Sequence, residues 1–397
     1  MSFPIRRLPI LTTRWHTTLF QRLPSFPRRC YSTPPSDSSS KIHLPCGPEE
    51  WSKHFKAPIL INHRISVRNP ATAATIADAF VPEGSQDKII VEAYPGPGQL
   101  TRALLALPKE RIKKLIVIEN WEPYLEWLRP LQEVDPRVEL VEMNPFLWDT
   151  YTRMTELGIL NDVQKIEWNK GVHPQLQFIS HLPSTVYSEQ LLSQFLRSMP
   201  EGHWLFSYGR IPLSFILSEH LYRRVVAAGQ DRSARCKLSV VAEATAECTA
   251  PLDFATTQPY EQHFHPFPSI RSLSIETKKD ARAIGRPFRT MNIVPLENQI
   301  VAKGQMDTWD FCLRRLYVKK STPLKDAINI LAPNSRVLIG AVTNPNLPES
   351  ERLDVSKKIR DMEAHEWAIF MKAFDNWPFK PSELTFQEGY SSSLRSL

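Results

Sequence analysis

Residues 90–101 read IVEAYPGPGQLT, and this stretch decides the fold class of the chain. An apolar run ends in the acidic Glu92, and a turn rich in proline and glycine follows before Leu100. Glycine adopts backbone conformations that other residues avoid, and it lets the backbone lie directly against a ligand. The pattern therefore predicts a strand, a tight ligand-binding turn and the start of a helix.

Strand-like and helix-like segments alternate along much of the chain. Helices are predicted over 71–80, 100–107, 124–131 and 189–199, and strands over 88–91, 115–118, 138–141, up to 178–179, and over 237–243. Such alternation is typical of a parallel sheet with helices on both faces. We expect an inserted loop at 281–304, where the pattern is less regular. Helices predicted over 309–317 and 361–374 make this end of the chain a small helical domain.

Length and composition limit the class of protein. The chain has 397 residues, of which 42% are hydrophobic, so it can bury a sizeable core and is expected to hold two domains. No window approaches the ~18 apolar residues that a membrane span needs, so we expect no membrane partner. The five cysteines form no C-x-x-C pair, and His263 and His265 have no further ligand at helical spacing. We therefore expect neither a disulfide framework nor a metal site.

The first 36 residues contain six arginines and no Asp or Glu. This composition is typical of a mitochondrial transit peptide, which we place at residues 1–32, and the expected location is the mitochondrial matrix. The whole chain has 49 basic and 42 acidic residues and a net charge of +7, so the chain without this segment carries about +1. Nucleic-acid binding therefore has to be judged from where charges cluster, not from their total.

Ligands of such sheets bind outside the carboxyl ends of the strands. Glu119 closes the run LIVIE and follows Gly98 by 21 residues, a spacing that suits an acid accepting hydrogen bonds from a ribose diol. Asn144 follows the next predicted strand. An alternative interpretation stays open, in which Gly96 and Gly98 only form a tight turn and Glu119 only caps its strand.

Three motifs make the chain resemble the rRNA adenine dimethyltransferases. That family's first motif reads Glu-x-Gly-Pro-Gly-x-Gly-x-Leu-Thr, and this chain matches it at Glu92, Pro95, Gly96, Gly98, Leu100 and Thr101. The stretch HPFPSIRS at 265–272 is similar to the family's Pro-x-Pro-x-Val-x-Ser segment. The stretch WDF at 309–311, with the basic residues after it, is similar to the start of the family's helical C-terminal domain.

The resemblance implies an α/β fold class: the Rossmann-like sheet of an S-adenosylmethionine-dependent methyltransferase with a small α-helical C-terminal domain. The residues that it assigns to S-adenosylmethionine are Tyr94, Gly96, Gly98, Glu119 and Asn144. The expected boundaries are the transit peptide at 1–32, a flexible lead-in at 33–55, the methyltransferase-like domain at 56–280, the helical domain with the inserted loop at 281–381, and a mobile tail at 382–397.

The departures from the family lie where the chemistry would be. Tyr94 replaces the first glycine of the turn, and Asn144 replaces an aspartate that accepts from the cofactor's adenine. The fourth motif reads Asn-Leu-Pro-Tyr or Asn-Leu-Pro-Phe in active members, and here it is His181, Leu182, Pro183 and Ser184. Stacking of a base on an aromatic ring contributes roughly 1–3 kcal/mol, which Ser184 cannot supply. The sequence therefore offers no confident catalytic residue.

This pattern resembles the fungal mitochondrial transcription factor B branch, in which a dimethyltransferase ancestor became an initiation factor. It implies a factor that assists the mitochondrial RNA polymerase in recognising and melting promoter DNA. One alternative is an active S-adenosylmethionine-dependent rRNA adenine N6-dimethyltransferase of the mitochondrial small subunit. Another is an RNA-binding assembly factor that contacts mitochondrial rRNA.

Nucleic acid would need cations for its phosphates and flat side chains for its bases. Trp309 and Phe288 are candidate stacking surfaces. The candidate phosphate contacts form three clusters: Arg223, Arg224, Arg232, Arg235 and Lys237; Arg271, Lys278, Lys279, Arg282, Arg286 and Arg289; and Arg314, Arg315, Lys319 and Lys320. Each cluster taken alone could also be an ordinary solvated face.

Overall fold

The structure of the chain is a computed structural model, and it describes residues 41–56, 63–268 and 283–384. Its strands are β1 (Ser66–Val67), β2 (Lys88–Ala93), β3 (Ile112–Ile118), β4 (Val138–Val141), β5 (Leu176–His181), β6 (Leu213–Ser218), β7 (Ala246–Thr249), β8 (Phe264–His265) and β9 (Phe288–Pro295). Its helices are α1 (Pro48–His54), α2 (Pro70–Phe80), α3 (Gln99–Leu105), α4 (Glu122–Val134), α5 (Trp148–Glu156), α6 (Val186–Glu201), α7 (Glu219–Val226), α8 (Lys237–Thr245), α9 (Tyr260–His263), α11 (Met306–Leu316), α12 (Leu324–Ala327), α13 (Val337–Val342) and α14 (Ala364–Asp375).

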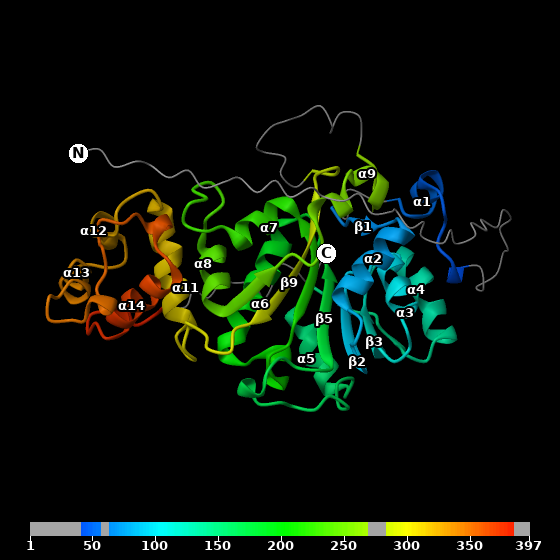
Figure 1. The fold of residues 1–397 in the computed structure, drawn as a ribbon, viewed down its shortest axis with the longest axis horizontal. Helices are drawn as coiled ribbons and strands as arrows, with labels where there is room; N and C mark the ends of the chain where they lie inside the picture. Colours follow the sequence, from blue (N-terminus) through cyan, green and yellow to red (C-terminus); the bar gives the residue numbers. More distant parts are fainter. Residues whose placement is uncertain (1–40, 57–62, 269–282, 385–397) are drawn as a thin grey trace, which may run out of the picture. The chain divides into compact units, whose positions relative to one another are not determined.

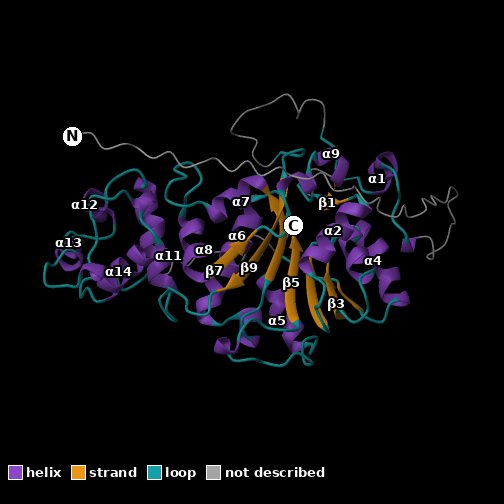
Figure 2. Ribbon diagram, viewed as in Figure 1, coloured by secondary structure: helices purple, strands orange, loops and turns teal. Residues whose placement is uncertain are grey.

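Within the described ranges, seven strands form one sheet in the order β4-β3-β2-β5-β6-β9-β7 (Figure 2). The strands from β4 to β6 run parallel, whereas β9 pairs antiparallel with both β6 and β7. The prediction of an α/β fold is confirmed, and the prediction of a wholly parallel sheet was wrong at the β9–β7 edge. Helices α2 to α4 and the later helices α6 to α8 cover the sheet in Figure 1.

Two segments were assigned wrongly from the sequence. The predicted inserted loop at 281–304 contains β9 at 288–295, where five of the eight residues are buried and three are half-buried. The predicted strand at 237–243 is the helix α8, which is buried along almost its whole length. A helix that is covered on every side has no polar face, so its sequence lacks the 3.6-residue periodicity that marks an amphipathic helix.

The C-terminal region is helical, as predicted. Helices α11 to α14 lie together at one end of the sheet (Figure 1), and α11 and α14 contact α6 and α8. The buried Trp309 and Trp367 belong to the same apolar cluster as Phe178 and Phe215 of the sheet. The helical region therefore shares its core with the sheet, and the domain boundaries expected from the sequence stay a prediction.

The described part of the lead-in is ordered, so the prediction of a flexible segment at 33–55 was wrong for residues 41–55. Trp51 of α1 is fully buried, and its Nε1 donates a hydrogen bond to the Pro45 carbonyl at 2.7 Å. Trp51 and Phe55 pack in one cluster with Tyr124 and Trp127 of α4. Burial of a large aromatic side chain contributes several kcal/mol, which fixes this segment on α4.

The remaining terminal predictions cannot be followed in the structure. The transit peptide at 1–32, residues 33–40 of the lead-in and residues 385–397 of the tail lie outside the described residues. No helix in the described part of the chain combines the length and the apolar character that crossing a bilayer requires.

Candidate functional site

Four parallel strands end at one edge of the sheet and bring the predicted site residues together. Ala93 of β2 is in register with Ile118 of β3 on one side and with Ser180 of β5 on the other, and Ile118 is in register with Val141 of β4. The next residues of these strands therefore emerge side by side. Tyr94, Glu119 and Asn144 follow the ends of β2, β3 and β4, and the fourth-motif segment at 181–184 begins with the last residue of β5.

The turn after β2 is built from residues in the left-handed region. Tyr94, Gly96 and Gly98 have φ values of 57°, 61° and 89°. A Cβ on Gly96 would lie 2.3 Å from Ser66 Oγ, and a Cβ on Gly98 would lie 2.6 Å from a methyl group of Leu128. The positive φ at both positions, with the Ser66 contact at Gly96, accounts for the two glycines within the chain, so their presence does not by itself indicate a bound cofactor.

Glu119 is fully buried, and other groups of the chain already satisfy its carboxylate. The Glu119 Oε1 atom accepts from Arg64 Nη1 at 2.7 Å and from the backbone N–H groups of Asn120 and Trp121, both at 2.9 Å. Its Oε2 atom accepts from Arg64 Nη2 at 2.5 Å. An ionised carboxylate offers about four lone-pair sites, so little capacity is left for a ribose diol.

Arg64 lies between two aromatic rings. The central carbon of its guanidinium is 5.1 Å from the centre of the Tyr94 ring and 5.1 Å from the centre of the Tyr124 ring. Burial by itself would lower the pKa of Arg64, but the charge of Glu119 and the hydrogen bonds to it raise that pKa above its usual value. Arg64 is therefore a stacked guanidinium that forms a bidentate ion pair with a buried carboxylate.

Glu92, the last residue but one of β2, is buried, and within the described part of the chain it forms no ion pair. Burial raises the pKa of Glu92 to about 8, although Thr101 and Arg102 act to lower it. Arg102 instead donates to the backbone carbonyls of the turn, of α4 and of residues 41–42, at 2.7 to 3.0 Å. Arg102 thus joins the glycine turn to the ordered N-terminal segment.

Asn144, the predicted adenine acceptor, caps its own turn. Its Oδ1 accepts from the backbone N–H of Phe146 at 2.9 Å. Its backbone carbonyl accepts from the Thr150 hydroxyl at 2.7 Å. The side-chain oxygen that the resemblance assigns to the cofactor is therefore used within the chain.

The fourth-motif residues are buried rather than open to a base. His181 is 5% exposed and contacts the rings of Phe264 and Phe288 edge-on. Burial, with a smaller contribution from Arg64, lowers the pKa of His181 to about 3, so its ring is neutral at pH 7. Ser184 is 3% exposed, and its backbone N–H donates to the His63 carbonyl at 2.9 Å. Leu182 is buried in the core, and the Pro183 carbonyl accepts from Ser188.

One aromatic pair near this edge was not used in the sequence-based prediction. Tyr187, at the start of α6, is 50% exposed, and its ring lies edge-on to Phe146 with the ring centres 5.2 Å apart. By contrast, Trp309 and Phe288 were predicted to stack on bases and are 0% and 1% exposed. Sequence position alone could not separate buried aromatic residues from accessible ones.

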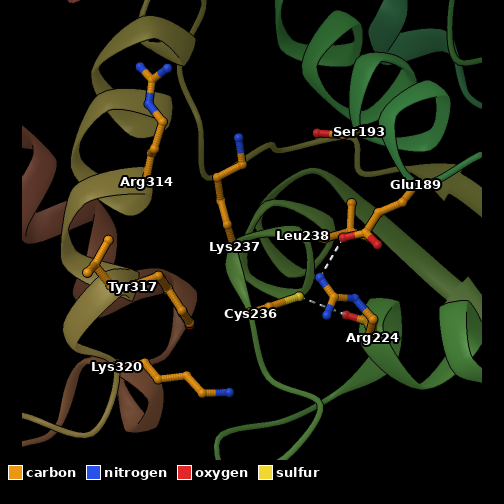
Figure 3. Close-up of a pocket in the computed structure, with 10 residues that line it drawn as sticks. Glu189, Ser193, Arg224, Cys236, Lys237, Leu238, Arg314, Tyr317 and Lys320 are labelled. Atoms are coloured by element: carbon orange, nitrogen blue, oxygen red, sulfur yellow. Dashed lines mark hydrogen bonds and ion pairs between the residues drawn. The ribbon is translucent and has the colours of Figure 1, made fainter. Parts of the chain in front are cut away.

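The first and third basic clusters meet at one cavity of about 410 Å³. Figure 3 shows Arg314, Tyr317 and Lys320 on its α11 side and Lys237 and Arg224 on the side of α8 and α7. The chain also provides counter-charges here: Arg224 pairs with Glu189 at 2.5 Å and Lys237 with Asp310 at 2.9 Å. The wall still carries more cations than carboxylates, which favours an anionic ligand.

The other predicted phosphate contacts lie elsewhere. Arg235 is 2% exposed, pairs with Glu243 and donates to the carbonyls of Ala227 and Met362. It is therefore a buried cross-link between α7, α8 and the C-terminal region. Its assignment to nucleic acid was wrong. Arg223 is exposed beside Asp231, and Arg315 stacks on its neighbour Phe311. Lys319 is exposed. The predicted residues Arg271, Lys278, Lys279 and Arg282 fall outside the described residues.

The residue that sequence analysis missed at this site is Arg64. It lies in an irregular segment before β1 and is 55 positions from its partner Glu119. No motif or periodicity marks it. The only available signal was indirect, because a buried acid at a strand end requires a cation or several hydrogen-bond donors.

The chain is similar in sequence to a known family and to several known proteins. The family model described as "Ribosomal RNA adenine dimethylase" matches residues 66–354. Mitochondrial transcription factor 1 of Lachancea kluyveri is 23% identical over 294 residues, which are 74% of this chain and 82% of that protein. Dimethyladenosine transferase 2, mitochondrial, of Bos taurus is 23% identical over 290 residues, 69% of each chain. The solved structure of 23S rRNA methyltransferase ErmE is 14% identical and covers 78% of this chain and 99% of its own, with a TM-score of 0.47.

These relatives confirm the mitochondrial location expected from the sequence and the resemblance to the mitochondrial transcription factor branch. The family model spans well over half of the chain. The chain therefore belongs to the ribosomal RNA adenine dimethylase family.

Proposed function

We propose that the chain is a mitochondrial transcription initiation factor that assists the mitochondrial RNA polymerase in recognising and melting promoter DNA. It would use a methyltransferase scaffold to hold nucleic acid without methylating it. Relatives that carry the name mitochondrial transcription factor 1 support this function. The structural observation that carries the proposal is the burial of His181 and Ser184 where an active enzyme must grip its target adenine.

Methyl transfer to an adenine amine requires that the base leave its stack and be held in line with the methyl donor. A neutral, buried His181 ring cannot reach an extruded base, and Ser184 offers no ring to stack on it. The Ser184 backbone N–H is already bonded to the His63 carbonyl. The residues in these positions therefore do not supply the contacts that the reaction needs.

Two other features of the chain suit a melted strand. The cavity lined by Lys237, Arg314 and Lys320 offers cations for phosphates. The exposed ring of Tyr187, supported by Phe146, offers a flat surface for an unpaired base. Cations along a groove together with an accessible ring are the elements that bind single strands without strict sequence preference.

Transcription from matched templates tests the proposal directly. The mitochondrial RNA polymerase would be supplied with a duplex promoter and with the same promoter carrying a pre-melted bubble at the start site, each with and without this protein. We expect strong stimulation on the duplex and little on the bubble, because melting is the step that the factor assists. Equal initiation on the duplex with and without the protein would contradict the proposal.

A second candidate function is rRNA adenine N6-dimethylation. It is supported by the family membership and by the bovine relative named as a dimethyladenosine transferase. Incubating the purified chain with small-subunit rRNA and radiolabelled S-adenosylmethionine tests it. Label in dimethyladenosine would establish the enzyme, and its absence together with stimulation on duplex promoters would leave the initiation factor.

A further inference from the structure

The N-terminal segment before and within β1 contacts three of the strand ends that would form a cofactor site. The His63 carbonyl accepts from the Ser184 backbone N–H beyond β5, at 2.9 Å. The Arg64 guanidinium binds both carboxylate oxygens of Glu119 beyond β3. The side chain of Ser66 lies against Gly96 in the turn after β2. Three nearby residues thus cover the ends of β5, β3 and β2.

The contact with Glu119 is the decisive one, because this carboxylate is the predicted acceptor for a ribose diol. Arg64 takes one hydrogen-bonding position on each oxygen, and two backbone N–H groups take further positions on Oε1. The side chain of Arg64 is only 12% exposed and that of Glu119 is 0% exposed. A diol could bind only by displacing a buried, charge-assisted pair of hydrogen bonds.

The position of Arg64 also explains Tyr94, the residue that replaces the first glycine of the family motif. Its ring forms one wall of the Arg64 site, and Tyr124 forms the other, each 5.1 Å from the guanidinium carbon. A glycine at position 94 would leave one face of the guanidinium uncovered. Tyr94 therefore belongs with Arg64 as part of a single internal filling, although its φ of 57° is unfavourable for a side chain of this size.

The remaining predicted cofactor acceptor is also engaged, since Asn144 Oδ1 caps the Phe146 N–H. The ribose acceptor Glu119 is thus occupied by Arg64 and two backbone N–H groups, Ser66 lies against the glycine turn, and the adenine acceptor Asn144 already accepts one hydrogen bond from the chain. S-adenosylmethionine does not fit the residues present. We propose that residues 63–66 form an internal plug, with Arg64 bound in the place of the ribose diol, so that the chain does not take up the cofactor. The plug would close the edge in the same way whether or not the chain assists a polymerase.

The first test uses the unmodified chain and S-adenosylhomocysteine, the product form of the cofactor, as the probe. Calorimetry and thermal melting at about 1 mM ligand are expected to show no heat of binding and no rise in melting temperature. A dissociation constant below about 100 μM would overturn the plug, because a ligand of that affinity gives a clear rise in melting temperature at this concentration. Transcription on duplex and bubble promoters is read separately, so the two proposals can fail independently.

The second test concerns the plug itself. Arg64→Ala is expected to lower the melting temperature by about 5 °C or more, because removing one partner leaves the Glu119 charge buried and uncompensated. The double variant Arg64→Ala/Glu119→Ala should show a smaller fall in melting temperature than the sum of the falls in the two single variants. The matched control is Arg68→Ala, an arginine four positions away whose guanidinium donates to the carbonyls of Glu261 and Gln262 and lies over the Phe267 ring.

Hydrogen exchange gives a local readout that general destabilisation would not reproduce. In the unmodified chain the backbone N–H groups of Asn120, Trp121 and Ser184 are expected to exchange slowly, since each has a partner that the plug holds in place. In Arg64→Ala these three should exchange faster, while amides in the middle of β2 keep their protection. Unchanged exchange at all three positions would show that Arg64 does not close this edge.

Discussion

Lys237 at the start of α8 donates to Asp310 of α11 across 2.9 Å, and the same carboxylate also pairs with Arg197 of α6. This contact connects a helix next to the sheet with the helical C-terminal region. It also lies at the cationic cavity, where Lys237 is one of the lining residues. Asp310 therefore has two opposing effects: it stabilises the junction and reduces the positive potential of the cavity.

Replacing Asp310 with asparagine should separate these effects. We expect Asp310→Asn to lower the free energy of unfolding by about 0.5–1 kcal/mol, because the pairs are partly exposed and screened by water. The same change should raise the affinity for single-stranded DNA about two- to five-fold at low salt, since one negative charge leaves the cavity. Denaturant titration and fluorescence anisotropy measure the two quantities.

The control is Asp78→Asn in α2. Its partner Arg111 precedes β3, near the edge of the sheet that lies away from the cavity. It should leave DNA affinity unchanged. A loss of DNA affinity in Asp310→Asn would mean that the carboxylate, and not the surrounding cations, is the group that contacts the ligand.

The cations of the cavity make a prediction about salt. Replacing Lys237, Arg314 and Lys320 together with alanine should weaken binding of single-stranded DNA at least about ten-fold at low salt. Each lost phosphate contact also reduces the slope of log K against log salt concentration by about 0.7. A matched triple replacement of Lys109, Lys113 and Lys170, exposed residues near the amino ends of the strands, should change neither affinity nor slope. Equal effects of the two triple variants would exclude the cavity as the binding site.

The sequence predicted the positions of Glu119 and Asn144 correctly because parallel strands end at a common edge. It did not predict what those residues contact. Arg64 is far from Glu119 in the chain, and one arginine among many carries no signal of burial. The same limit explains Arg235, which belongs to a basic cluster in the sequence and is a buried cross-link in the fold.

Secondary structure shows a related limit. Periodicity was informative where one face of an element meets water, as in α4, and uninformative where no face does. The strand β6 is buried at every position and was not predicted, and the almost fully buried α8 was assigned as a strand. Tertiary packing decides such segments, because apolar residues on all sides fit either structure.

The glycine turn gives a prediction about packing that needs no cofactor. Gly96→Ala should lower the free energy of unfolding by about 2–4 kcal/mol, since φ is 61° and the new Cβ would lie 2.3 Å from Ser66 Oγ. Adding Ser66→Ala should recover part of the loss, because the Oγ clash disappears while the Ser66 Cβ, 3.1 Å from the new methyl, stays. Chemical denaturation of the two single variants and the double variant measures the coupling. Strict additivity would show that Ser66 does not approach the turn.

Glu92 makes stability depend on pH in a predictable direction. Burial raises the pKa of its carboxyl from 4.5 to about 8, so the folded chain holds a proton that the unfolded chain releases. The protonated carboxyl therefore makes its full contribution to the free energy of unfolding below pH 4.5, and this contribution is lost as the pH rises toward 8. Glu92→Gln keeps a neutral group of the same size, so at pH 8 it should be more stable than the unmodified chain by roughly 2–4 kcal/mol, with the difference vanishing near pH 4.

Denaturation at both pH values measures this difference in stability, with Glu83→Gln on the surface as the control. A Glu92→Gln chain that is equally or less stable at pH 8 would mean that Glu92 is ionised in the fold, held by Arg102.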